Sequence, residues 1–292
     1  MNPAFRIKKS TLLHLRIPFS FYLLPVFLFA LGNQRPSSWT SVILSFFILH
    51  FLLYPATNGY NSYFDKDEKS IGGLKNPPAV EKQLYSVSLL LDAVSIILGL
   101  LISPMFSVML LVFGLASKAY SHPSIRLKKY AVTGWIITGF FQGFFSYLMI
   151  AEAITKKGLL VFSDINNLIP AFLCTALLWG SYPMTQVYQH EEDQKRGDIT
   201  LSIRLGIRGT FIFSALVFLF SNALFILYFM EWQSLLTAML FEIFLAPMLL
   251  YFLSWMKMSF RDPSLADHFH TMRLNLISSL CLNAFFTLCL VL

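Results

Sequence analysis

Residues 39–69 read WTSVILSFFILHFLLYPATNGYNSYFDKDEK, an apolar run that ends in a cluster of amide and acidic side chains. A helix needs about 20 mostly apolar residues to cross the hydrocarbon core of a bilayer. Residues 39–58 have that length and composition. The stretch therefore predicts a transmembrane helix whose polar end leaves the membrane near Asn58.

Long apolar runs of this kind recur along the whole chain. The candidate spans are 15–32, 39–58, 84–102, 105–121, 131–152, 168–189, 210–230, 233–256 and 272–291. Only 13% of the 292 residues are charged, whereas soluble domains carry about 25%. The sequence thus predicts an all-α, polytopic membrane protein in which nine transmembrane helices form a single domain over residues 1–292. The short connections at Ser103-Pro104 and Glu231-Trp232 predict helical hairpins that pack antiparallel.

The basic residues fall almost entirely on one side of the predicted membrane. With nine crossings, the N-terminal side takes all but three of the 22 lysines and arginines, the exceptions being Arg35, Lys156 and Lys157. Loops rich in Lys and Arg stay in the cytoplasm during insertion. We therefore expect a multi-pass protein of the cell (inner) membrane with a cytoplasmic N-terminus, Arg6 included. Because the net charge of +7 sits in these short loops, we expect no nucleic-acid partner.

Two predicted helix ends on the cytoplasmic side carry matching polar side chains, in the loops at about 58–82 and 186–208. Each end has two amides followed by a carboxylate, spaced three and four residues apart: Asn58, Asn61 and Asp65 in the first, and Gln186, Gln189 and Asp193 in the second. Residues at that spacing share one face of a helix. Amide and carboxylate oxygens suit Mg²⁺, which bridges carboxylates to substrate phosphates. The alternative is that these residues merely solvate helix ends, but Asn58, Asn61 and Gln186 lie close to apolar sequence, where polar groups are costly.

A third polar segment follows the fourth span on the same side. It reads Tyr120-Ser-His-Pro-Ser-Ile-Arg126-Leu-Lys128-Lys129. Its cations could neutralise a diphosphate, although for Lys129 a role in membrane orientation alone is favoured. Polar residues inside the spans have structural explanations: Asp92 could form a buried pair, and Glu152, near the outer end of its span, is expected to be solvated. Gln142 could approach a second substrate, but an interhelical hydrogen bond is the favoured role.

These three segments together resemble the UbiA superfamily of intramembrane prenyltransferases. The first family motif, Asn-x-x-x-Asp-x-x-x-Asp, is similar to Asn61-Ser-Tyr-Phe-Asp65 and its continuation. The second, Asp-x-x-x-Gly-x-x-Thr-Leu followed by Leu-Gly, is similar to the stretch from Asp193 through Leu201 with Leu205-Gly206. The resemblance covers roughly the first 210 residues, and the last three spans match only as helices.

The chain departs from the family pattern in both motifs. The third Asp of the first motif falls at Lys69, which leaves Asp67 and Glu68 as substitutes and could let Lys69 contact diphosphate directly. The second family motif begins four residues before Asp193, as Asp-x-x-x-Asp, and the first Asp of that stretch falls at Gln189. Fewer carboxylates therefore surround the metal than in the family pattern, and an inactive homologue is one alternative.

The resemblance implies a UbiA-type bundle with a cytoplasmic-side active site and a Mg²⁺-dependent transfer. A polyprenyl group would pass from an isoprenyl diphosphate to a lipophilic, aromatic or quinone-precursor acceptor, with membrane lipid around the chain. It implies catalytic roles for Asp65 and Asp193, and metal ligation by Asn61, Asp65, Gln189, Glu192 and Asp193. It implies substrate binding by Asn58, Asp67, Glu68, Lys69, Tyr120, Arg126, Lys128, Gln186 and Tyr188. The aromatic faces of Tyr60 or Tyr188 could stabilise a carbocation. The alternatives are a UbiA-type terpene cyclase and, less favoured, a transporter; the sequence names neither the acceptor nor the prenyl length.

Overall fold

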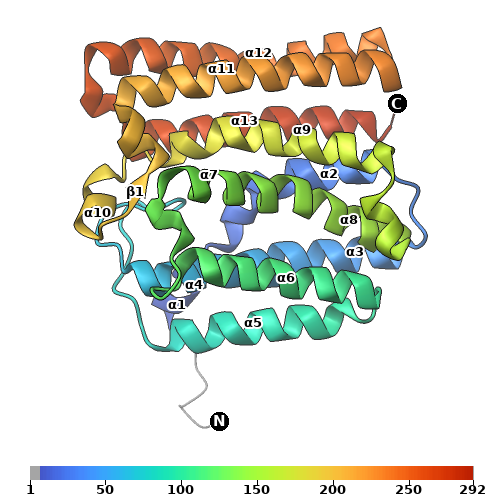
Figure 1. Cartoon of the computed structure of the whole chain (residues 1–292), viewed down its shortest axis with the longest axis horizontal. Helices are drawn as coiled ribbons and strands as arrows, with labels where there is room; N and C mark the ends of the chain where they lie inside the picture. Colours follow the sequence, from blue (N-terminus) through green and yellow to red (C-terminus); the bar gives the residue numbers. More distant parts are fainter. Residues whose placement is uncertain (1–6, 292) are drawn as a thin grey trace.

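The chain folds into a bundle of long helices that lie side by side (Figure 1). The structure is a computed structural model that describes residues 7–291. Arg6, expected on the cytoplasmic side, lies outside the described residues. In chain order the elements are α1 (Lys9–Leu15), η2 (Ile17–Leu23), α2 (Leu24–Asn33), α3 (Trp39–Phe47), η3 (Ile48–Leu53), α4 (Tyr54–Asp65), α5 (Gln83–Gly99), α6 (Pro104–Ser121), η4 (Leu127–Lys129), α7 (Ala131–Gly139), η5 (Phe140–Phe145), α8 (Ser146–Thr155), η6 (Gly158–Phe162), α9 (Ile165–Ser181), η7 (Tyr182–Thr185), α10 (His190–Lys195), β1 (Ile199–Thr200), α11 (Leu201–Trp232), α12 (Leu235–Arg261), η8 (Pro263–Leu265) and α13 (His268–Cys289). The segments η3 and η5 are π-helical and the other η segments are 3₁₀-helical.

Helices long and apolar enough to cross a membrane make up most of the chain. Within residues 7–291 there are eight, counting a helix and its short 3₁₀ or π interruption as one. They are Lys9–Asn33, Trp39–Asp65, Pro104–Ser121, Ala131–Thr155, Ile165–Thr185, Leu201–Trp232, Leu235–Arg261 and His268–Cys289. The third expected span, 84–102, corresponds to α5, a shorter apolar helix of 17 residues. The polytopic helical fold is therefore confirmed, while nine crossings stay a prediction.

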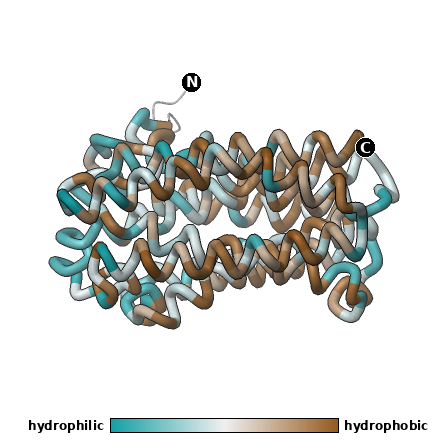
Figure 2. The backbone as a smooth tube through the Cα atoms, turned by 90° about the horizontal axis from the view of Figure 1, so that it is seen from above, coloured by the Kyte–Doolittle hydropathy of each residue, from teal (hydrophilic) through white to brown (hydrophobic). Residues whose placement is uncertain are grey.

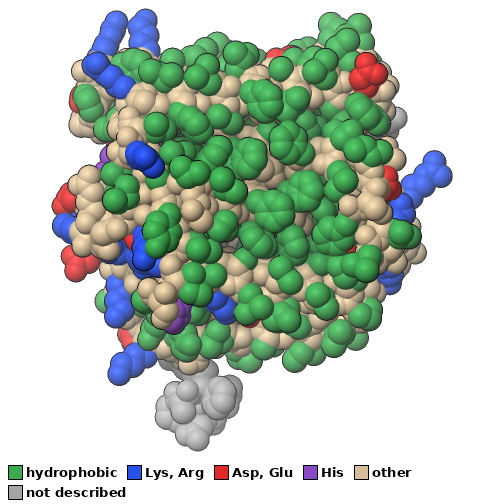
Figure 3. Space-filling view, in the orientation of Figure 1, with side chains coloured by type: hydrophobic (Ala, Val, Ile, Leu, Met, Phe, Trp, Pro, Cys, Tyr) green, Lys and Arg blue, Asp and Glu red, His purple; other side chains and the backbone are tan. Residues whose placement is uncertain are grey.

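The outer surface of the bundle is suited to lipid. Figure 2 shows a hydrophobic middle between two hydrophilic ends, and Figure 3 shows a broad hydrophobic face with Lys and Arg gathered mainly at one edge. Large apolar side chains are exposed on the outside of the bundle, among them Leu90, Ile97, Leu216, Leu219, Ile243 and Leu250. An apolar surface of this extent in a water-soluble protein would mark a binding or aggregation site. In this chain it forms the lipid-facing wall of the helices.

Both predicted hairpins are present, and in each hairpin the second helix begins at a serine cap. The Ser103 hydroxyl accepts a hydrogen bond from the Phe106 N–H at 3.0 Å, and Pro104 occupies the first turn of α6, where its missing N–H costs nothing. The Ser234 hydroxyl accepts from the Thr237 N–H at 3.1 Å at the start of α12. In consequence α6 packs on α5 and α12 packs on α11 (Figure 1).

Two acidic side chains inside the spans have structural partners. Asp92 on α5 forms an ion pair with Lys118 on α6. Glu152 was expected to be solvated, and this was wrong: its side chain is buried and accepts hydrogen bonds from the Ser103 hydroxyl and the Gly158 N–H, both at 2.7 Å. It thereby ties the α5–α6 turn to the end of α8.

The sixth predicted span ends earlier than expected. Instead of a continuous helix over 168–189, α9 ends at Ser181, and a 3₁₀ turn and an irregular turn follow. Pro183 explains the break, because it has no N–H to donate to the carbonyl one turn earlier. Gln186 and Gln189 therefore do not lie on a continuing helix as their spacing had suggested.

The gathering of basic loops at one end makes the orientation testable. In a background without Cys174, Cys281 and Cys289, we expect Lys156→Cys to react with a membrane-impermeant maleimide in intact cells. Ser70→Cys, at the opposite end, should react only after the membrane is permeabilised, since the positive end stays inside. The reverse labelling pattern would show that the predicted orientation is inverted.

Candidate active site

The first polar stripe lies on one face of α4, as its spacing predicts. Asn58, Asn61 and Asp65 all line the same internal cavity. Gly59 lies on the other face, where an added Cβ would meet the Ser88 hydroxyl of α5 at 2.4 Å. Glycine therefore lets α4 approach α5 closely and presents its polar face to the cavity.

The second motif reaches the same cavity through a turn rather than a helical stripe. Gln186 and Gln189 lie in the irregular segment before α10, and Asp193 lies on α10. All three line the cavity. After α10 the chain reverses at Gly197, whose φ of 75° is in the left-handed region that favours glycine. The reversal brings Asp198 back beside α10, where its N–H donates to the Asp193 carbonyl at 2.9 Å.

The third polar segment is attached to the second motif by short parallel β-bridges. Tyr130 pairs with Ile199, and Ala131 pairs with Thr200. These bridges are formed by β1, which lies at the same end of the bundle as α10 in Figure 1. They fix the basic segment before α7 against the loop that follows α10, so that cations and carboxylates from distant parts of the chain meet.

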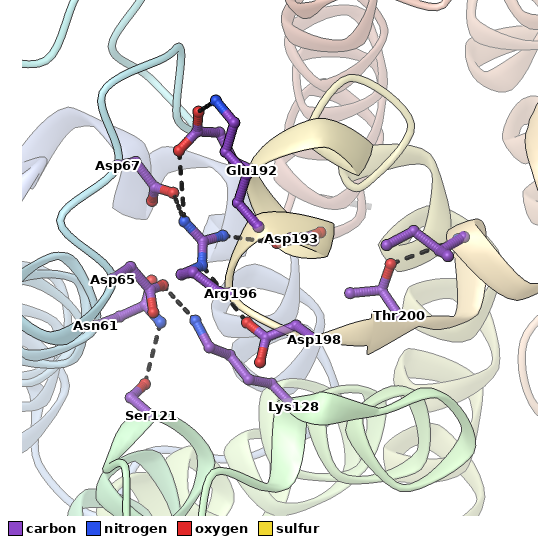
Figure 4. Close-up of polar contacts among 12 residues, drawn as sticks. Asn61, Asp65, Asp67, Ser121, Lys128, Glu192, Asp193, Arg196, Asp198 and Thr200 are labelled. Atoms are coloured by element: carbon purple, nitrogen blue, oxygen red, sulfur yellow. Dashed lines mark hydrogen bonds and ion pairs between the residues drawn. The ribbon is translucent and has the colours of Figure 1, made fainter.

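Arg196 lies at the centre of the resulting charge network (Figure 4). Its Nη1 forms an ion pair with Asp67 of the first motif, and its Nη2 lies 2.7 Å from Asp193 Oδ1 of the second. Its Nη1 also lies 3.9 Å from Glu192 Oε2, and its Nε lies 3.5 Å from Asp198 Oδ2. With 17% of its side chain exposed, this guanidinium joins carboxylates from both motif loops.

A second part of the network surrounds Asp65. Lys128 forms an ion pair with Asp65 Oδ2, and Arg126 Nη2 donates to Asp65 Oδ1 at 3.3 Å. Arg126 also donates from Nε and Nη2 to the two oxygens of Asp198, each at 2.7 Å. A bidentate pair of this kind fixes the plane of the guanidinium as well as its position.

Burial and charge shift the pKa values of the groups beyond the helix ends. Burial raises the pKa of Asp193 to about 6, although Arg196 and Lys128 oppose the shift. Burial, with the nearby charge of Asp65, also raises the pKa of Asp67. Burial alone would lower the pKa of Arg196, but the charges of Asp67, Asp65 and Asp193 outweigh it and raise it. The guanidinium therefore stays charged.

The cavity has a volume of about 310 Å³ and changes character along its length. Its polar mouth holds the carboxylates, amides and cations described above. Farther from the mouth its walls are mainly apolar, formed by residues such as Val26, Cys174, Phe225, Met248, Leu282 and Phe286. On α13 the lining extends from Leu274 to Phe286, which corresponds to about 18 Å of helix at 1.5 Å per residue. Such a cavity can hold an amphiphile with a charged head and a long apolar tail.

The structure brings most of the predicted site residues together. Those that line the cavity are Asn58, Asn61, Asp65, Asp67, Tyr120, Lys128, Gln186, Tyr188, Gln189 and Asp193. Arg126 and Glu192 do not line it but contact residues that do.

Three residues suggested by the sequence lie elsewhere. Glu68 is exposed, and Lys69, 55% exposed, pairs with Glu191 at the surface. Tyr60 is buried on the far side of α4, where the Lys118 Nζ lies 5.0 Å from its ring centroid. The substitution of Lys69 for an acidic motif residue therefore removes a carboxylate without placing a cation in the cavity.

Three site residues were not predicted from the sequence. Arg16 was assigned only to orientation, yet it lines the cavity and donates to the carbonyl oxygens of Gly72 at 3.1 Å and Asn58 at 3.3 Å. Arg196 and Asp198 stood inside the second motif without a role. The only signal for them was the charged run around Gly197, and a run of charges does not reveal which side chains turn inward.

The donor atoms at the mouth fit Mg²⁺ in type. Asn61 and Asp65 from one side, and Gln189 and Asp193 from the other, offer amide and carboxylate oxygens to one cavity, the ligands that Mg²⁺ prefers. Within residues 7–291 no three His, Cys, Asp or Glu side chains are grouped so as to hold an ion. Of the carboxylates predicted to bind metal, each motif contributes one that lines the cavity, Asp65 and Asp193. Lys128 forms an ion pair with the first, and Arg196 with the second.

Comparison with known proteins identifies relatives of the same architecture. The model of the UbiA prenyltransferase family matches residues 22–277. A search of curated proteins found no match.

Among solved structures, a UbiA homolog from Aeropyrum pernix K1 has a TM-score of 0.72 at 15% identity, with 93% of this chain and 97% of that chain covered. A UbiA homolog from Archaeoglobus fulgidus bound to GPP and Mg²⁺ has a TM-score of 0.63 at 17% identity, with 97% and 100% covered. A structure of digeranylgeranylglyceryl phosphate synthase has a TM-score of 0.61 at 21% identity, with 97% and 99% covered. These likenesses show the fold.

The central position of Arg196 generates a stability prediction. Arg196→Met should lower stability by about 1–3 kcal/mol, because it leaves buried carboxylates without their partner. The loss should appear as a lower apparent unfolding temperature in detergent, and adding Asp67→Asn should recover part of it. Lys195→Met is the matched control, because Lys195 pairs with Glu191 at the exposed surface. An unchanged unfolding temperature for Arg196→Met, or strict additivity with Asp67→Asn, would mean that the guanidinium does not hold the two motifs together.

Proposed function

We propose, on the basis that this chain belongs to the UbiA prenyltransferase family, that it transfers a polyprenyl group within the membrane. The donor is an isoprenyl diphosphate, the acceptor is a lipophilic molecule, aromatic or a quinone precursor, and the reaction depends on Mg²⁺. The observation that best supports this proposal is that Asp65 and Asp193, one from each motif, line the polar mouth of a cavity whose other end is apolar.

The shape of the cavity supports an isoprenyl diphosphate as donor. The diphosphate is a multiply charged head that needs cations, and Lys128, Arg126 and Arg196 surround the mouth. The prenyl tail is a hydrocarbon, and its burial among the apolar walls is favourable at about 25 cal/mol per Å². A ligand in this orientation would have its cleavable C–O bond just inside the mouth.

Charge stabilisation is the main contribution that the residues of this chain can make to bond cleavage. As the C–O bond breaks, negative charge grows on the leaving diphosphate, and fixed positive groups lower the energy of that state most where water is excluded. Arg126 and Arg196 are held in place by Asp198, Asp67 and Asp193, so they need little reorganisation. If Mg²⁺ is bound, Asn61, Asp65, Gln189 and Asp193 would hold it, and it would add positive charge beside the diphosphate.

The allylic carbocation needs a different environment from its leaving group. Tyr120 and Tyr182 line the cavity below the charged mouth, and their hydroxyls are hydrogen-bonded to each other. Tyr188 lines it as well, with its ring centroid 5.2 Å from that of His268. Aromatic faces attract a desolvated cation by about 2 kcal/mol. They can therefore shield the cation from water until the acceptor captures it.

The placement of the protein in the cell is part of the same proposal. The chain acts as a single domain over residues 1–292 in the cell (inner) membrane, with its N-terminus and both motif loops in the cytoplasm. The concentration of Lys and Arg at the end that carries the motif loops supports this orientation (Figure 3).

Loss of either motif aspartate should abolish diphosphate release. With purified protein in detergent and labelled geranylgeranyl diphosphate, Asp65→Asn and Asp193→Asn should each slow release by at least about 100-fold, the scale seen when a charge-stabilising group is removed. Chelation of Mg²⁺ should have a comparable effect. Glu191→Gln is the matched control for Asp193→Asn, since Glu191 lies on α10 as Asp193 does, but its carboxylate is exposed at the surface.

The products distinguish the alternatives. Release that requires an acceptor from a panel of phenols, naphthoates and glycerol phosphates supports prenyl transfer. Release without any acceptor, giving a hydrocarbon or an alcohol, would establish a terpene cyclase instead. No release with any chain length would favour an inactive homologue or a transporter.

A further inference from the structure

The guanidinium of Arg196 keeps hydrogen-bond donors that the protein does not use. Within residues 7–291, Arg196 donates one of its five N–H groups to Asp67 and one to Asp193, so three remain. Its Nε is buried and lies 3.5 Å from Asp198 Oδ2 without forming a hydrogen bond. Because the side chain lines the cavity, these unused donors belong to a fixed cation at the place where we propose that the diphosphate binds.

Arg196 also joins the two motif loops directly (Figure 4). Its Nη1 pairs with Asp67, which follows α4, and its Nη2 lies 2.7 Å from Asp193 Oδ1 on α10. A divalent ion shared by the two motifs would bind carboxylates from the same two loops. A guanidinium with one carboxylate on each side therefore fills a position that such an ion could otherwise take.

Ion pairs within the protein leave few carboxylate oxygens for a metal. Four carboxylates line the cavity, those of Asp65, Asp67, Asp193 and Asp198. Both oxygens of Asp65 and both of Asp198 accept hydrogen bonds from lysine or arginine. Within residues 7–291, Asp67 Oδ2 and Asp193 Oδ2 have no such donor. Mg²⁺ is commonly bound through one or two carboxylates and keeps several waters, so these two oxygens match the needs of one ion.

The departures from the family motifs agree with this count. Lys69 and Gln189 stand where the family pattern has aspartates. Gln189 lines the cavity as a neutral amide, whereas Lys69 forms an ion pair with Glu191 of α10 at the surface. Two positions that could supply metal-binding carboxylates therefore supply none, and cations of the protein link the two loops.

A guanidinium is chemically suited to a diphosphate. Its donors form a planar fork that matches phosphate oxygens and can make two hydrogen bonds at once. In phosphoryl-transfer enzymes an arginine stabilises the charge that develops on phosphate oxygens beside a metal ion. Arg196 has the free donors for such a contact, and its carboxylate partners hold it in place.

We propose that the diphosphate is bound by a single Mg²⁺ together with Arg196, which acts as a second cation built into the protein and donates hydrogen bonds to the diphosphate. This inference rests on the proposed prenyl transfer and specifies its cations. When the prenyl C–O bond breaks, its electron pair leaves with the diphosphate, and Arg196 meets that charge by hydrogen bonding without giving up a proton. Without the guanidinium, Asp67 and Asp193 could hold a second divalent ion between them.

The number of ions bound with a diphosphate tests the proposal without relying on activity. Purified protein in detergent is dialysed to equilibrium against Mn²⁺ and labelled inorganic pyrophosphate. Complexes formed in solution are equal on both sides, so the excess on the protein side gives the ions held per bound pyrophosphate. We expect one Mn²⁺ per pyrophosphate in the wild-type protein and two in Arg196→Gln. At low Mn²⁺ this variant should bind pyrophosphate about tenfold more weakly or worse, because it loses hydrogen bonds to a charged group.

Two further variants separate this role from a structural one. Arg196→Lys keeps the positive charge and should keep one Mn²⁺ per pyrophosphate, with weaker binding because the planar fork is lost. Lys195→Gln is the matched control, since Lys195 is the neighbouring cation but is 58% exposed and pairs with Glu191. It should change neither quantity. If Arg196 only held the loops together, Arg196→Gln would lower the unfolding temperature and leave one ion per pyrophosphate.

Two ions per pyrophosphate in the wild-type protein, or one in Arg196→Gln, would overturn the inference. So would release of diphosphate from geranylgeranyl diphosphate that rises with the square of a limiting Mg²⁺ concentration rather than with its first power, a result that needs no variant. Each of these results leaves prenyl transfer standing. Absence of release at every Mg²⁺ concentration would instead remove the proposed function.

Discussion

The guanidinium of Arg196 bridges two loops that are far apart in the sequence, and the geometry of the site depends on this contact. Asp67 follows α4, Asp193 lies on α10, and Arg196 contacts both carboxylates. The neighbouring pair of Arg126 with Asp198 adds the segment before α7. Three segments with little regular structure of their own thereby form one polar mouth. Their relative positions are fixed by these ion pairs and by the short β-bridges of Tyr130 and Ala131 to β1.

A network of this density is sustainable only at a membrane boundary. In the middle of a bilayer, charged side chains are expensive even in pairs, and in open water exposed pairs contribute less than about 1 kcal/mol. At the helix ends the side chains are largely buried by protein, so their attraction is poorly screened, while water can still reach the mouth. The same location lets a charged head group enter from solution while its tail stays among apolar helices.

The sequence predicted the helical fold and the meeting of its motifs, but not the connections between them. Apolar runs identified each of the eight helices within residues 7–291 that are long and apolar enough to cross a membrane, because membrane helices must satisfy their own backbone hydrogen bonds and need a minimum length. The spacing of Asn58, Asn61 and Asp65 was read correctly as one face of a helix. The same spacing at Gln186, Gln189 and Asp193 was misread, because Pro183 ends the helix before them. The inward turn of Arg196 could not be predicted, since it follows from the left-handed turn at Gly197 and from partners contributed by other loops.

Two departures from regular α-helix, η5 and η7, lie where the bundle surrounds its cavity. Backbone groups inside a membrane must be paired, so irregular turns are tolerated only where protein or a cavity, rather than lipid, surrounds them. The π-helical segment η5 carries Gln142, and the 3₁₀ segment η7 carries Tyr182; both residues line the cavity. Thr175 satisfies the backbone at η5 with its own hydroxyl. A straight helix places a residue at a given face only every third or fourth position. The two irregular turns change that register locally, and so they bring polar side chains to one level of an otherwise apolar bundle, next to the place where a bound diphosphate would meet its tail.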